Sequence, residues 1–165
     1  MTGAASIREK HDGELVDRSN VRLWLRLLTC TTVIEKRLKR GFADQYDITL
    51  PRFDVMAALD RNPAGMSMGQ LSQELLVSNG NVTGVVQNLV RDNYVSISPS
   101  PSDGRASIVR LTQLGRECFT GIAEAHHEWV DMMLARLTRD QRTALYDILG
   151  ALNGSLADDN RKDQG

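Results

Sequence analysis

The feature that most constrains the fold of this 165-residue chain is a change of hydrophobic period within residues 67–112. In the first half of that stretch, 67–91, two adjoining segments repeat apolar residues at the spacing of one helix face. In the second half, 95–111, apolar and polar residues alternate in two short runs. Helical spacing indicates amphipathic helices and alternation indicates strands. The order therefore predicts two short helices followed by a β-hairpin.

Each predicted helix has its own start signal. Ser67 with Gln70 three residues later forms a capping box, and Ser78 can accept backbone N–H groups of the next turn. The second helix then carries one apolar stripe, formed by Val82, Val85, Val86 and Leu89. Because β-branched valines lower helix propensity slightly, we expect packing of this stripe to hold the helix.

The opposite face of the second helix is small and polar. It consists of Gly80, Thr83, Gly84, Gln87 and Arg91. Each glycine costs a helix about 1 kcal/mol relative to alanine. A missing Cβ would let a DNA groove approach the backbone closely, while the alternative is that the glycines are simply tolerated on a solvated face. The nearby Asn79, Asn81, Thr83 and Gln87 are uncharged donors and acceptors of the kind that contact base edges or phosphates.

The tip of the predicted hairpin has strong turn chemistry. Residues 98–104 contain two prolines and the pair Asp103-Gly104, and Arg105 follows. A cation at a hairpin tip beside a recognition helix is placed to enter a minor groove, whose negative potential attracts it. The alternative is an ordinary solvated arginine.

Together these pieces resemble the MarR family of bacterial transcriptional regulators over nearly the whole chain. The resemblance is carried by the helix entry VSNGNVTGVVQNL at 77–89, the Asp-x-Arg motif at 103–105 and the exit Leu111-Thr112-x-x-Gly115. Many family members have a basic residue in place of Gly104 and an arginine in place of Asn79.

The resemblance implies a mainly α fold with a small β-hairpin, a winged helix-turn-helix flanked by N- and C-terminal dimerisation helices. The whole chain, 1–165, would be a single MarR-like domain, with the DNA-binding unit at 49–112 and dimerisation helices at 15–41 and 113–158. The DNA-binding residues it implies are Ser67, Ser78, Asn79, Gly80, Asn81, Thr83, Gly84, Gln87 and Arg105. Asp103 is expected to brace the wing.

The N-terminal flank predicts two helices. Apolar residues recur at helical spacing from about Asp17 to Arg40, and Gly41 is expected to end that helix. A shorter helix is expected from Thr49 through Asp60. Its inward residues would be Phe53, Met56 and Ala57.

The C-terminal flank predicts two more helices. After Thr112, apolar residues step 4, 3, 4, 3 along a heptad seam: Cys118, Ile122, Ala125, Trp129 and Met132. Thr138 with Gln141 forms another capping box, and a last apolar stripe follows: Leu145, Ile148, Leu149, Leu152 and Leu156. These faces predict a homodimer joined at both ends of the chain, although they could instead cover a monomer core. A dimer would bind an inverted repeat in double-stranded DNA with half-sites about 10 base pairs apart, or a multiple of that.

The charges in the sequence do not predict a strongly basic DNA-binding surface. The net charge is −1, and the three arginines between residues 67 and 112 are balanced by three acidic residues. We therefore expect affinity to depend on hydrogen bonds and helix N-termini more than on counterion release. The densest basic run, 36–40, is expected to lie at the end of the first helix, where cations suit the helix dipole, with phosphate contact as the alternative.

Regulation follows only from the resemblance, which implies release of DNA by a small aromatic or anionic effector. Candidate lining residues are Trp24, Arg26, Phe53 and Trp129, which also suit a core or an interface. Cys30 and Cys118 sit among apolar helical neighbours, where a thiol is usually inert. A regulator that senses redox conditions through one of these thiols is a second alternative.

Other functions find little support. His127-Glu128 starts like a zinc-protease helix but has Asp131 where a second histidine is required, and neither glycine pattern matches a nucleotide loop. We expect no enzyme activity, metal or cofactor. Without a signal peptide or a membrane span, the expected location is the cytoplasm. A winged helix that binds only another protein remains the alternative from another class.

Overall fold

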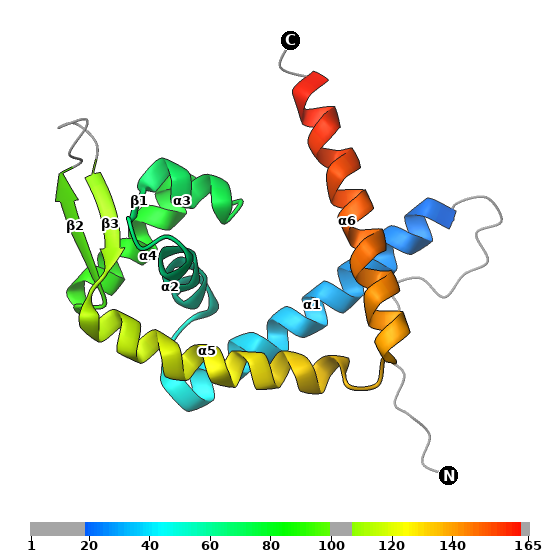
Figure 1. Ribbon diagram of the computed structural model, residues 1–165, viewed down its shortest axis with the longest axis horizontal. Helices are drawn as coiled ribbons and strands as arrows, with labels where there is room; N and C mark the ends of the chain where they lie inside the picture. Colours follow the sequence, from blue (N-terminus) through cyan, green and yellow to red (C-terminus); the bar gives the residue numbers. More distant parts are fainter. Residues whose placement is uncertain (1–18, 100–106, 163–165) are drawn as a thin grey trace. The chain divides into compact units, whose positions relative to one another are not determined.

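The computed structural model describes residues 19–99 and 107–162, apart from the side chains of 158–162. It is mainly α with a small antiparallel sheet, as the sequence predicts. Figure 1 labels the elements. They are α1 (Ser19–Tyr46), α2 (Leu50–Arg61), β1 (Met66–Ser67), α3 (Met68–Glu74), α4 (Asn79–Arg91), β2 (Val95–Pro99), β3 (Ser107–Leu111), α5 (Gln113–Leu134) and α6 (Arg139–Lys162). The chain divides into two compact units, residues 1–126 and 127–165.

The predicted hairpin is present and belongs to a three-stranded sheet of order β1-β3-β2. Its register runs from Val95 opposite Leu111 to Pro99 opposite Ser107. The extra strand β1 has two residues, too few to show any alternation, and pairs Met66 with Val109. Ile97 was expected to alternate inward with Val95, but its side chain is exposed.

The core of the first unit lies where α2, α3 and α4 pack beside the sheet (Figure 1). The predicted stripe of α4 supplies Val82, Val86 and Leu89, all with no exposed surface, while Val85 is half-buried. Helix α2 is buried on more sides than its sequence pattern shows, since Val55, Ala58 and Leu59 are buried beside the predicted Phe53 and Met56. Burial of these apolar side chains, more than helix propensity, holds the short helices together.

An aromatic cluster around Phe53 joins three helices. The Phe53 ring centroid lies 4.6 Å from that of Phe42 on α1, 5.6 Å from that of Phe119 on α5 and 4.7 Å from that of His126. Such pairs add stability beyond the apolar area they bury. The cluster anchors α1 and the first part of α5 to α2.

Helix α1 corrects one prediction. Gly41 does not end the helix, which continues to Tyr46, where Asp47 turns the chain with a positive φ of 49°. Phe42 is fully buried against Phe53, and this packing outweighs the helix cost of one glycine, about 1 kcal/mol. The predicted start near Asp17 lies outside the described residues.

The same correction applies to the basic run 36–40. It lies in the body of α1, whose last turn has no basic residue, so the helix dipole does not explain it. Two of its cations are instead paired along the helix, Lys39 with Glu35 at 2.6 Å and Arg40 with Asp44 at 3.3 Å. Exposed pairs of this spacing contribute a few tenths of a kcal/mol.

The start of α5 explains the Leu111-Thr112-x-x-Gly115 motif. The Thr112 hydroxyl accepts from the Gly115 N–H at 2.9 Å, and it lies 2.7 Å from the Asn93 carbonyl, to which it donates. A Cβ on Gly115 would lie 2.0 Å from the Tyr94 carbonyl oxygen, closer than real Cβ atoms approach. Glycine is therefore required where α5 crosses the turn between α4 and β2.

The second unit contains the end of α5 and all of α6. The predicted capping box opens α6, because Thr138 and Gln141 exchange side-chain to backbone hydrogen bonds of 2.9 and 3.2 Å. The predicted stripe of α6 is exposed along its length. Its members are Leu145, Ile148, Leu149, Leu152 and Leu156. None of the helices in the described ranges is both long and apolar enough to cross a membrane.

Candidate nucleic-acid interface

The two helices of the helix-turn-helix begin at the predicted caps. The Ser67 hydroxyl accepts from the Gln70 N–H at 3.2 Å, and the Gln70 side chain accepts from the Ser67 N–H at 2.8 Å. Ser78 caps α4 by accepting from the Asn81 N–H at 3.4 Å. Between the helices Leu76 takes a positive φ of 54° and is 91% exposed. These caps and this turn fix where the N-terminus of α4 points.

The glycines of α4 lie on an open face. Gly80 and Gly84 are exposed, and a Cβ built on either would meet no atom within 4 Å. The fold of the described chain therefore has no steric need for glycine at these positions. By helix propensity alone, alanine at each would be more stable by about 1 kcal/mol.

Polar groups surround these glycines. Asn79, Asn81 and Gln87 are exposed, and within residues 19–99 and 107–162 their side-chain amides form no hydrogen bond. Thr83 is half-buried and its hydroxyl donates to the Asn79 carbonyl at 2.8 Å, which leaves its oxygen as an acceptor. Arg91 bonds Asn88 at 2.6 Å at the far end of the helix. The face thus offers uncharged donors and acceptors to an outside partner.

Ion pairs brace this unit, and the sequence analysis did not anticipate them. Arg52 of α2 pairs with Asp92, the C-cap residue of α4, and its guanidinium carbon lies 5.9 Å from the Tyr94 ring centroid. Arg61 of α2 pairs with Glu74 of α3 at 2.7 Å. The partners are 40 and 13 residues apart, so no local pattern points to them.

These ion pairs engage arginines that could otherwise contact DNA phosphates. Arg52 is partly buried, Arg61 is held by Glu74, and Arg110 on β3 donates to the Ser98 hydroxyl at 2.8 Å. The predicted wing residues Asp103, Gly104 and Arg105 lie outside the described residues. The described face of α4 therefore presents polar groups with little net charge.

The four candidate effector residues are spread over several elements. Trp24 and Arg26 are exposed on α1, Phe53 is buried in the aromatic cluster, and Trp129 is half-buried on α5 in the second unit. The predicted seam of α5 is also divided, since Ile122 is buried in the core of the first unit whereas Met132 is exposed.

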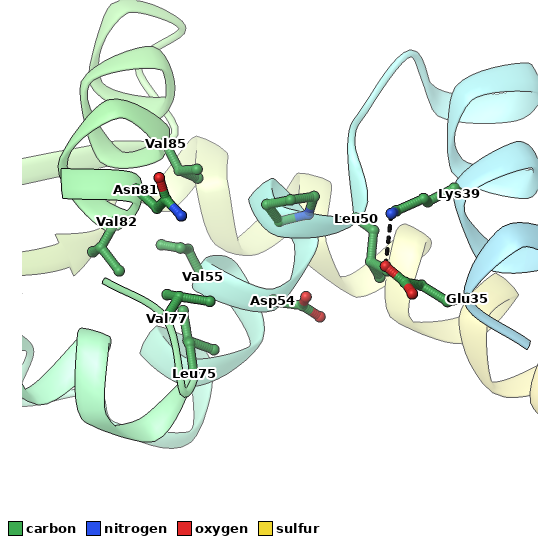
Figure 2. A pocket seen from close by; sticks show the side chains of 11 residues that line it. Glu35, Lys39, Leu50, Asp54, Val55, Leu75, Val77, Asn81, Val82 and Val85 are labelled. Carbon is green, nitrogen blue, oxygen red and sulfur yellow. Dashed lines mark ion pairs between the residues drawn. The ribbon is translucent and has the colours of Figure 1, made fainter. Parts of the chain in front are cut away.

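A cavity of about 400 Å³ opens between α1, α2 and α4, and we call it the α1–α4 cavity (Figure 2). One wall is apolar and comes from α2, the turn before α4 and α4 itself: Val55, Leu75, Val77, Val82 and Val85. The other side carries Asp54 and the Glu35–Lys39 ion pair, and Asn81 of α4 lies beside the valines. None of the four predicted effector residues lines it.

The pKa values of Asp54 and Tyr94 are shifted. Burial, with the nearby Glu35 as second cause, raises the pKa of Asp54, and Arg61 partly opposes the shift. The Cys118 thiol, the main cause, raises the pKa of the Tyr94 phenol. Cys118 is half-buried, whereas Cys30 is exposed on α1.

Known proteins share both the sequence and the fold of this unit. A family model described as the MarR family matches residues 46–106. A transcriptional activatory protein of Rhodopseudomonas palustris is 32% identical over 105 residues, which cover 62% of this chain and 59% of that protein. The chain thus spans less than two thirds of that relative's length.

Solved structures extend the similarity to most of the chain. A MarR family transcriptional regulator from Silicibacter pomeroyi is 33% identical with a TM-score of 0.70, covering 83% of this chain and 94% of that one. A MarR family regulator from Streptomyces coelicolor, solved in complex with DNA, is 21% identical with a TM-score of 0.74, covering 81% and 88%. The second likeness concerns the fold alone.

Proposed function

Since this chain belongs to the MarR family of transcriptional regulators, we propose that it binds double-stranded DNA as a homodimer. In this proposal it represses transcription from an inverted-repeat operator and releases the operator when a small ligand binds. The cytoplasm is its place of action.

The observation that carries DNA binding is the open face of α4. Two glycines stand there at a cost in helix stability that the described fold does not require, beside side-chain amides without partners. A surface that approaches the backbone closely and exchanges hydrogen bonds with amides would account for both. A major groove, with α4 lying in it, is such a surface.

Each predicted DNA-binding residue would have a role in this interface. Ser67 and Ser78 hold the helix N-termini, whose N–H groups suit phosphates. Asn79, Asn81, Thr83 and Gln87 would contact base edges or phosphates, and Gly80 and Gly84 would admit the groove wall. Arg105, braced by Asp103, would reach the neighbouring minor groove.

Homodimerisation is supported by the apolar residues that one chain leaves uncovered. Large apolar side chains are exposed at the start of α1 and along α6, including Leu23, Trp24, Ile148 and Leu156. Exposed apolar side chains gathered on a helix in this way typically mark a protein interface. A second copy would bring a second α4, so the operator would contain two half-sites.

The test is a matched pair of glycine variants in a DNA mobility shift. Gly84→Arg should weaken operator binding at least tenfold, because a long side chain would hold the groove away from the helix. Gly121→Arg, at another exposed helical glycine with open space, should keep wild-type affinity. Both should remain dimers by size exclusion. Unchanged affinity for Gly84→Arg would refute this account of the α4 face.

Repression and ligand release are tested in a reporter strain. Deleting the gene should raise expression from a promoter that contains the operator, and an effector should raise it in the wild type. A fall in expression on deletion would identify an activator instead. A chain that shifts no DNA even at low salt would be a protein-binding winged helix.

A further inference from the structure

The α1–α4 cavity has the size and the walls of a small-molecule site. Its volume of about 400 Å³ lies within the range of roughly 300–1,000 Å³ typical of ligand pockets. Five apolar side chains form one wall, while the charged groups gather on the other side (Figure 2). A fitting ligand therefore has an apolar body and one polar end.

The charged residues on that side determine whether the polar end of the ligand is a cation or an anion. Two carboxylates, Glu35 and Asp54, face one ammonium group, and that ammonium of Lys39 already lies 2.6 Å from Glu35. Within residues 19–99 and 107–162, Asp54 has no hydrogen-bond or ion-pair partner. Arg61, the cation that lowers the pKa of Asp54, is held by Glu74. An anion entering here would meet the uncompensated Asp54 carboxylate.

A cation would meet the opposite situation. It would supply the partner that Asp54 lacks, and Glu35 could be shared because its pair with Lys39 is half-exposed and exposed pairs contribute little. Burial and then Glu35 raise the pKa of Asp54, and a cation bound beside it would oppose both effects.

We propose that the α1–α4 cavity binds a small cationic amphiphile, whose ammonium group is received by Asp54 and Glu35 and whose apolar body lies on the valine wall. This charge is opposite to that of an anionic effector, one of the two kinds, aromatic or anionic, that the family resemblance implies. The proposal thus names a further ligand class. It also names a site that is lined by none of the predicted effector residues, Trp24, Arg26, Phe53 and Trp129.

The position of the cavity connects ligand binding to DNA binding. Asn81, Val82 and Val85 of α4 line it, and Asn81 also lies on the face proposed to meet DNA. A ligand seated there would contact α1, α2 and α4 together and bias the position of the recognition helix. This consequence rests on the proposed function, whereas ligand binding itself does not.

Three probes with one apolar body test the charge selection on the full chain. Isothermal titration calorimetry at pH 7.5 compares 3-phenylpropylamine, 3-phenylpropan-1-ol and 3-phenylpropanoate. The amine should bind at least tenfold more tightly than the alcohol, and the acid most weakly. Acid binding as tight as amine binding, or no binding of the amine, would overturn the proposal.

Two matched variants locate the site. Asp54→Asn should weaken amine binding at least tenfold, while Asp60→Asn, an exposed acid on the same helix, should match the wild type. Thermal unfolding confirms that both variants fold. Equal amine affinity in Asp54→Asn and wild type would contradict the assignment.

Operator titrations with and without the amine separate the two proposals. Loss of operator affinity on adding amine supports both, and Asp54→Asn should be insensitive to it. If a bound amine does not change operator binding, the proposed coupling between the α1–α4 cavity and DNA binding is wrong. The proposed amine site would still stand. An absence of operator binding in any condition would overturn the proposed function, and the calorimetric result would stand by itself.

Discussion

At the scale of single residues, glycines that look alike in the sequence have opposite physical roles. Gly115 is required by the chain's own packing, because a Cβ would strike the Tyr94 carbonyl, whereas Gly84 and Gly121 face open space. Such a difference cannot be read from composition or spacing, since it depends on which backbone crosses the helix. Substitution at these positions therefore separates fold from function.

We expect Gly115→Ala to lower the free energy of unfolding by roughly 1–3 kcal/mol or more, because the clash is with backbone that cannot rotate away. Gly121→Ala should raise it by up to about 1 kcal/mol through helix propensity. Urea unfolding monitored by circular dichroism measures both. Equal effects of the two alanines would contradict the crossing of α5 over Tyr94.

Asp54 gives a prediction in pH. Its pKa is raised above the ordinary 3.8, mainly by burial and then by Glu35, so the folded chain holds this proton to a higher pH than the unfolded chain. The protonated Asp54 carboxyl therefore adds to the free energy of unfolding at acid pH. This contribution is lost as pH rises from 3.8 through the raised pKa of the folded chain.

Asp54→Asn removes that ionisation. The variant should therefore gain stability relative to wild type as pH rises through this window, and should remain the more stable protein at pH 7. Urea unfolding at steps from pH 4 to pH 7.5 gives the difference between the two free energies. A difference that stays constant with pH would show that Asp54 titrates as a free carboxyl does.

At the scale of elements, the sequence predicts the helices and strands whose start signals and apolar patterns lie within their own residues. The capping boxes at Ser67 and Thr138, the valine stripe of α4 and the pairing of β2 with β3 as a hairpin follow from local patterns, and the structure contains each of them, although Ile97 of β2 is exposed. The end of α1 was mispredicted because burial of Phe42, a tertiary effect, overrides Gly41. Strand β1, the Arg52–Asp92 pair and the α1–α4 cavity join distant residues, so no periodicity reveals them.

The exposed stripe of α6 gives the prediction for this scale. Ile148→Glu places a charge in a stripe that the chain's own core does not bury, so the monomer fold should survive while the proposed dimer dissociates. Thr143→Glu, on the opposite side of the same helix, is the control. Sedimentation velocity reports the masses. A dimer that persists in Ile148→Glu would exclude this stripe from the interface.

At the scale of the whole molecule, the proposed DNA-binding protein carries little net charge. The chain carries a net charge of −1, and the described arginines of the DNA-binding unit are largely engaged within the protein. Affinity then has to come from close approach of α4, from its polar side chains and from two linked copies. Linking two sites raises affinity without new contacts in either one.

The central claim is that two copies of α4 bind one symmetric DNA site, and selection of bound sequences from a random DNA pool tests it most directly. The wild-type chain should enrich an inverted repeat whose half-sites are about 10 base pairs apart or a multiple of that, and Gly84→Arg should enrich none. Enrichment of a single unrepeated site, or of no sequence at all, would contradict the account.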